Sequence, residues 1–187
     1  MTDSTAINAM PQPADLLLEA DPGGTARPIW LVREQTLPSE IAGIDAAQCA
    51  WLRSSGFTGA ARKHVVLPDA GGGVAGAVLG LGSGTAGDPC GPSALLAGLL
   101  PAALPPGAYR LAGSSPEDEL AAIAWALGAY RFRRYKSANG DALPRLALPA
   151  SVEEASVRAI VEAVSLGRDL VNTPSNDMGP AELEAAS

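Results

Sequence analysis

AYRLAGSSPEDELAAIAWALGAYRF, residues 108–132, joins a strand pattern directly to a helix pattern. Residues 108–111 form the strand. Ser115 can cap the helix that follows, and the acids at 117–119 complement the positive end of its dipole. Apolar residues at helical spacing continue this helix to about Phe132. A strand followed at once by a capped helix is the repeating unit of α/β folds.

The same alternation extends in both directions along the chain. An Ala-Gly-Gly-Gly turn at 70–73 separates two strand patterns and predicts a tight, hairpin-like connection. The pattern as a whole predicts an α/β fold, with a mixed sheet and helices on both of its faces. We expect strands at residues 29–32, 64–67, 74–81, 108–111 and 145–148, helices at 38–55, 93–100, 116–132 and 151–171, and either a strand or a helix at 15–20.

The helix expected at 151–171 is long enough to bridge two domains. Ser151 with Glu154 reads as a capping box at its start. A last helix begins after Pro180 and stops within about two turns, which is too short to be stable alone. We therefore expect an N-terminal α/β domain at 1–150, a linker helix at 151–171 and the truncated start of a second domain at 172–187. The apolar stripe expected on the linker helix comprises Val152, Ala155, Ile160, Ala163, Val164, Gly167, Leu170 and Val171.

Composition favours a globular protein of the cytoplasm. The 187 residues are 47% hydrophobic and carry a net charge of -7, which gives no electrostatic reason to bind nucleic acid or an anionic membrane. No run of about 18 apolar residues predicts a membrane span, and the first residues lack the order of a secretory signal. Cys49 and Cys90 share no motif, which is typical of a reducing compartment.

The segment Gly82–Gly87 matches the G-x-G-x-x-G pattern of dinucleotide sites and follows an expected strand. The context differs, because residues 88–92 form a Pro- and Gly-rich loop where a helix should begin. Residues 112–114 also provide no acid to bind a ribose. A plain Gly-rich connection is the favoured interpretation, and nucleotide binding is kept as an alternative.

Other chemically active residues are scattered. His64 is the only histidine, and transition-metal sites need several converging ligands. The acids at 117–119 and 153–154 fit helix N-termini. The basic and aromatic run at 130–136 resembles a nucleic-acid patch, but in an acidic chain it fits better as a helix end with inward rings.

Two segments resemble one family. WALGAYRFRRYK at 125–136 and GRDLVNTPSNDMGPAEL at 167–183 are similar to the leucyl (cytosol) aminopeptidases, which are dinuclear-metal exopeptidases. In that family a helix with G-x-Y-x-F precedes the linker helix, and R-D-L-V-N-T-P-x-N-x-M-x-P-x-x-L opens the catalytic domain. Residues 56–59, GFTG, also resemble a segment of its shorter bacterial members.

The resemblance implies a two-domain enzyme that forms hexamers and removes N-terminal residues, often Leu, from peptides. It implies two divalent ions, Mn or Zn, which activate water and stabilise the tetrahedral intermediate. The family's N-T-D-A-E-G-R ligand motif does not occur in this sequence. We therefore predict no catalytic, metal-binding or cofactor-binding residue here, although Asp177 and Glu182 fall in the domain-opening segment. The chain alone is expected to be inactive. The alternative function without catalysis is that of an oligomerisation or binding module.

Overall fold

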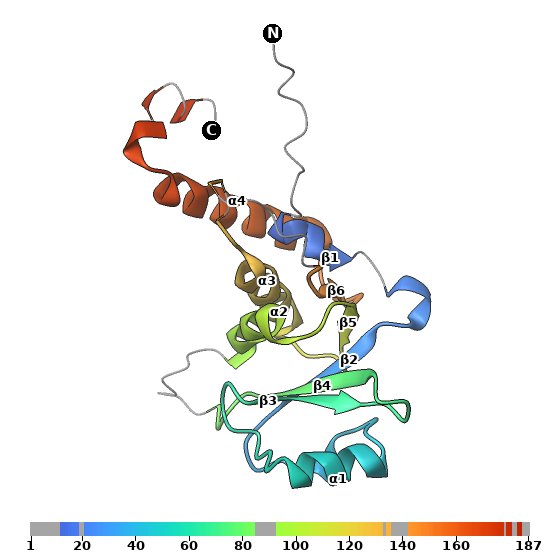
Figure 1. Ribbon diagram of the computed structural model, residues 1–187. Coiled ribbons are helices and arrows are strands. Elements are labelled where there is room, and N and C mark those ends of the chain that lie inside the picture. The colour runs from blue at the N-terminus through green and yellow to red at the C-terminus, as the bar shows by residue number, and fades with distance from the viewer. Residues whose placement is uncertain are drawn as a thin grey trace.

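The computed structural model describes residues 12–18, 21–84, 93–132, 134–135, 142–177, 179–180 and 183–184. Within these residues the strands are β1 Leu17–Leu18, β2 Arg27–Val32, β3 His64–Pro68, β4 Val74–Gly80, β5 Ala108–Leu111 and β6 Arg145–Ala147. They form one six-stranded sheet in the order β1-β6-β5-β2-β4-β3 (Figure 1). Neighbouring strands are parallel except for the β3–β4 hairpin, so the predicted mixed sheet is confirmed.

Helices cover both faces of this sheet, as predicted. The α-helices are α1 Ala46–Ser54, α2 Leu100–Ala103, α3 Asp118–Ala129 and α4 Glu154–Asn172. Figure 1 shows α1 on one side of the sheet and α2 with α3 on the other. Short 3-10 helices connect these elements: η1 Pro13–Leu16, η2 Pro22–Gly24, η3 Pro38–Glu40, η4 Ser93–Leu99 and η5 Ser175–Asp177.

The central strands separate two apolar clusters because side chains alternate along a strand. On β2, Ile29 belongs to the larger cluster, whereas Trp30 and Val32 belong to the smaller cluster that α1 covers. On β4, Leu79 faces the larger cluster and Val78 the smaller one. Burial on both faces explains why these strands read as nearly continuous apolar runs.

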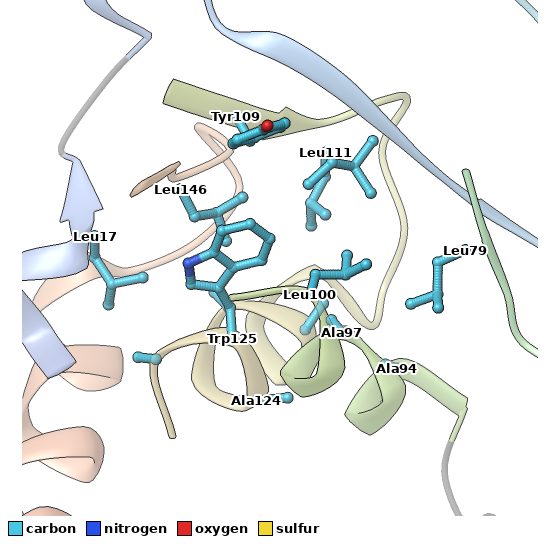
Figure 2. Packing of buried hydrophobic residues seen from close by; sticks show 14 of the residues in the cluster. Leu17, Leu79, Ala94, Ala97, Leu100, Tyr109, Leu111, Ala124, Trp125 and Leu146 are labelled. Carbon is cyan, nitrogen blue, oxygen red and sulfur yellow. The ribbon is translucent and has the colours of Figure 1, made fainter. Parts of the chain in front are cut away.

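The larger cluster is centred on Trp125 of α3, which is completely buried. Its ring lies 6.1 Å from the Tyr109 ring at an angle of 45°. Figure 2 shows Leu17, Leu100 and Leu146 around the same indole. One aromatic side chain therefore joins β1, β5, β6, α2 and α3.

Two glycines let η4 lie directly against α3. A Cβ atom on Gly128 would lie 1.9 Å from the carbonyl oxygen of Gly98, and one on Gly98 would lie 2.7 Å from that of Ala124. Carbon and oxygen atoms cannot approach so closely without a shift of the backbone. The small residues at these points therefore set the distance between the two helices.

The helix expected at 38–55 is interrupted. The 3-10 turn η3 ends at Glu40, Gly43 has a φ of 84°, and α1 begins only at Ala46. Asp45 caps α1 by accepting a 2.7 Å hydrogen bond from the backbone N–H of Gln48. This capping box was the missed signal, because an Asp followed three residues later by Gln marks a helix start.

The other helix boundaries also differ from the predicted ones. Helix α3 begins at Asp118 and ends at Ala129, because Tyr130 has an extended ψ of 133°. Helix α4 begins at Glu154, three residues after the predicted cap at Ser151. Its Glu154 carboxylate forms an ion pair with Arg158 and closes no capping box.

Helix α4 packs against the sheet domain through residues outside the predicted stripe. Val157 and Val161 are completely buried in the larger cluster, and Ser165 is buried one turn later. Arg158 adds hydrogen bonds to the carbonyl oxygens of Ala14 (2.6 Å) and Leu17 (2.8 Å). The first half of α4 therefore also fixes η1 and β1. None of the described helices combines the length and apolar character that a membrane crossing needs.

Candidate functional site

In open α/β sheets, ligands bind at the carboxyl edge where the strand order reverses. In this sheet the chain continues from β2 to β4 towards one edge, and from β5 to β6 towards the opposite edge. The strand order therefore reverses between the neighbouring strands β2 and β5. Arg33 follows β2 and Glu117 precedes α3, and their side chains form a 4.0 Å ion pair across this point. Both side chains are nearly half exposed, so the pair contributes little stability.

The described part of the Gly-rich segment packs onto this ion pair. Gly82 accepts a 3.0 Å hydrogen bond from the backbone N–H of Glu34. A Cβ atom on Gly84 would lie 1.8 Å from the Arg33 guanidinium, and its φ of 66° also favours glycine. The carboxylate of Glu117 next to this point disfavours a phosphate at the start of α3. Residues 85–87 of the motif and the loop at 88–92 lie outside the described residues, and nucleotide binding stays untested.

A cavity of about 300 Å³ opens at the carboxyl ends of β5 and β6. Its two charged residues, Asp21 and Arg110, form an ion pair of 3.8 Å, and Asp21 also accepts a hydrogen bond from the Ala26 N–H. The described lining therefore offers space for a small molecule but no nucleophile beside a base. The lining residues are Asp21, Arg110, Leu111, Gly113, Ser114, Ala147, Leu148, Pro149, Ala150 and Ser151.

The described residues do not fit a dinuclear metal centre. Among them, no group of three or more His, Cys, Asp or Glu side chains could hold a metal ion. His64 is exposed at the start of β3, and the buried thiol of Cys49 donates to the carbonyl oxygen of Pro38 at 3.3 Å. Cys90 and Glu182 lie outside the described residues.

The strongest polar constellation joins the end of α3 to the end of α4. The Tyr130 hydroxyl donates a 2.6 Å hydrogen bond to Asp169 and accepts one of 3.2 Å from the Asn172 side-chain amide. The Arg168 guanidinium lies 5.3 Å from the centre of the Tyr130 ring and donates to the carbonyl oxygen of Leu127 at 2.9 Å. We call Tyr130, Arg168, Asp169 and Asn172 the clamp.

Burial and the Asp169 carboxylate raise the pKa of Tyr130 above its ordinary value of 10.0, against smaller lowering effects of Asn172 and Arg168. A few residues farther along, the Tyr135 hydroxyl donates to Asp177 of η5, and this hydrogen bond raises the pKa of Tyr135. Asp177 therefore serves a contact between segments. Both tyrosines stay protonated at neutral pH and act as hydrogen-bond donors.

The clamp residues come from the two family-like segments, 125–136 and 167–183. Sequence reasoning identified both segments but missed that they contact each other. The expected helix-end role of the basic run is confirmed at Arg131, whose guanidinium donates to the carbonyl oxygens of Gly128 and Tyr130. The expected inward packing of its rings is wrong at Tyr135, which is 53% exposed. Arg133 and Lys136 lie outside the described residues.

The mixed sheet and its helices define an α/β domain that leads into the long helix α4. The clamp lies where the end of α3 meets the end of α4. Residues 27–149 of this domain match the family model described as the M17 aminopeptidase N-terminal domain. The chain therefore belongs to the M17 aminopeptidase family. This result confirms the resemblance to leucyl aminopeptidases.

One solved structure supports the same assignment, and two others support the fold. The cytosol aminopeptidase from Coxiella burnetii is 31% identical, with a TM-score of 0.76 over 92% of this chain and 36% of its own. The bottromycin maturation enzyme BotP in complex with Mn is 22% identical, with a TM-score of 0.60 over 84% of this chain and 34% of its own. A mutant of tomato leucine aminopeptidase is 20% identical, with a TM-score of 0.57 over 89% of this chain and 39% of its own.

At their lower identities, the last two structures support the fold alone. The chain spans little more than a third of the length of the three structures, which all extend well beyond the matched part. A comparison by sequence with curated proteins found no match.

Proposed function

We propose that the chain is the N-terminal portion of a metal-dependent leucyl aminopeptidase that releases N-terminal amino acids from peptides. The match of residues 27–149 to the M17 N-terminal domain carries this proposal. The cytosol aminopeptidase from Coxiella burnetii supports it, since that structure aligns with 92% of this chain. The chemistry then belongs to the part of the enzyme that follows the matched domain.

The proposed enzyme uses two divalent ions, Mn or Zn, which supply an activated water and polarise the peptide carbonyl. Side chains of a second domain hold both ions, because the described residues of this chain offer no group of ligands that fits them. The role of the present chain is structural. It builds a folded domain around Trp125 and directs α4 towards the peptidase domain.

We also propose that the enzyme is cytoplasmic and works as a hexamer on peptide substrates. The name of the Coxiella burnetii relative, a cytosol aminopeptidase, favours this location. The oligomeric state rests on the resemblance to leucyl aminopeptidases. Sedimentation of the complete enzyme tests it, with six subunits as the expected mass and a monomer as the contrary result.

Hydrolysis of a leucine anilide tests whether catalysis requires the second domain. The 187-residue chain, supplied with Mn or Zn, is expected to give no turnover above the metal-only blank. The complete enzyme is expected to hydrolyse the substrate, and a chelator is expected to abolish its activity. Chelator-sensitive turnover by the 187 residues alone would overturn the proposal.

A further inference from the structure

Helix α4 has two apolar sides, and one of them packs on the sheet domain. Val157 and Val161 on the inner side are completely buried in the larger cluster. Arg158 beside them is bonded to backbone carbonyls of the N-terminal segment. These contacts fix the rotation of α4 about its own axis, so the direction of its other side is also fixed.

The outer face of α4 consists of Ile160, Val164, Gly167 and Val171, which recur at the i, i+4, i+7, i+11 spacing of one helix side. Ile160 is 40% exposed, Val164 37% and Val171 85%. All four residues belong to the apolar stripe expected on the linker helix. The structure leaves the side chains of this face exposed, next to the side of α4 that packs on the domain.

An uncharged row of large apolar side chains on a helix surface is typical of a contact with another folded unit. Simple solvent exposure explains single apolar residues well, but it does not explain three on one side of a helix. Glu162 and Asp169 lie on a different side of α4, so the outer face itself carries no charge. Its partner must therefore present an apolar surface.

We propose that the peptidase domain of the same enzyme packs on the outer face of α4. This inference rests on the proposed function. The occupant follows from the family match: residues 27–149 match an N-terminal domain, and the Coxiella burnetii relative is aligned over only 36% of its chain. Helix α4 is the long element that follows the matched residues. A domain that begins a few residues after Asn172 is the nearest candidate to cover Val171 and Val164.

The clamp gives this surface a fixed direction. Tyr130, Arg168 and Asp169 bind the last turns of α4 to the end of α3. The helix therefore cannot bend away from the sheet domain at its C-terminal end without breaking these contacts. Both inner packing and the clamp hold α4 as a rigid arm, on which the second domain docks in one orientation.

Hydrogen exchange measures this docking without reference to catalysis. Backbone amides at 160–171 are compared between the 187-residue chain and the complete two-domain enzyme. We expect exchange in the two-domain enzyme to be slower by about tenfold or more, because docking suppresses local opening of the helix. Equal exchange in the two proteins would overturn the proposal.

Two matched variants in one turn of α4 sharpen the test. Val164→Glu places a charge in the outer face, whereas Glu162→Gln changes an exposed residue on another side of the helix. In the two-domain enzyme, Val164→Glu is expected to return exchange at 160–171 to the rate of the 187-residue chain, and Glu162→Gln to leave it slow. Equal effects of the two variants would contradict docking on this face.

Two further readouts separate the possible failures. An unmodified two-domain enzyme that lacks peptidase activity would refute the proposed function, whereas an active enzyme with fast exchange at 160–171 would refute the docking alone. Sedimentation of the 187-residue chain is expected to show a monomer. A dimer that Val164→Glu dissociates would assign the outer face to a second copy and overturn the proposal.

Discussion

The hydroxyl of Tyr130 at the end of α3 donates a 2.6 Å hydrogen bond to the carboxylate of Asp169 in the last turns of α4. The two residues are 39 positions apart, and each lies in a segment typical of leucyl aminopeptidases. Helix α3 ends at Ala129, directly before this contact, and Tyr130 has a ψ of 133°. Tyr130 and Asp169 thus join the end of α3 to the end of α4.

Tyr130→Phe removes the hydroxyl and keeps the ring. We expect a loss of about 1 kcal/mol in the free energy of unfolding, below the range of about 1.5–3 kcal/mol for a bond to a charged group because the site is partly exposed. Asp169→Asn keeps an oxygen acceptor and removes a negative charge from a helix C-terminus, so it should cost less. Urea unfolding of both variants measures this, and a larger loss in Asp169→Asn would contradict the assigned roles.

The clamp also predicts a dependence on alkaline pH. Burial, and then Asp169, raise the pKa of Tyr130 in the folded protein above 10.0, so the folded state holds this proton more tightly than the unfolded state. The resulting stability is complete below the ordinary pKa and is lost as the pH rises through the raised one. Urea unfolding across this range should show a smaller alkaline loss for Tyr130→Phe than for the unchanged chain. Identical losses would show that Tyr130 does not contribute.

Two glycine substitutions should act in opposite directions. An alanine at Gly128 would place its Cβ 1.9 Å from the Gly98 carbonyl oxygen, so Gly128→Ala should lower stability by about 2 kcal/mol or more. Gly167→Ala in α4 meets nothing within 4 Å and should raise stability by about 0.5–1 kcal/mol, as usual in a helix. Thermal unfolding compares them, and a harmless Gly128→Ala would refute the close packing of η4 on α3.

Sequence periodicity predicted the sheet well because the β2 and β4 patterns depend on residues such as Ile29 and Leu79, whose burial in the sheet does not depend on the loops. It failed at helix boundaries and at the packing of α4. Asp45 begins α1 later than expected, and Tyr130 ends α3 earlier. The apolar stripe expected on α4 did not include Val157 and Val161, which are the residues buried there. A helix with two apolar sides does not reveal from its spacing which side its own domain covers.

Ser165 supplies a prediction on the inner side of α4. Its hydroxyl is buried and has no hydrogen-bond partner among the described residues. Ser165→Ala should therefore leave stability unchanged or raise it by up to about 1 kcal/mol, since an unsatisfied buried hydroxyl is costly and alanine favours the helix. Val161→Ala, one turn earlier, should cost about 2 kcal/mol by opening a cavity. If Ser165→Ala were the more damaging of the two, this hydroxyl would have an essential partner.

The division of labour between this chain and a second domain is the central claim, and metal titration tests it most directly. Calorimetry of the 187-residue chain with Mn and with Zn is expected to show no saturable binding of two ions per chain, because its described residues lack a group of ligands. The complete enzyme is expected to bind two. Saturable binding of two ions by the 187 residues alone would contradict the account.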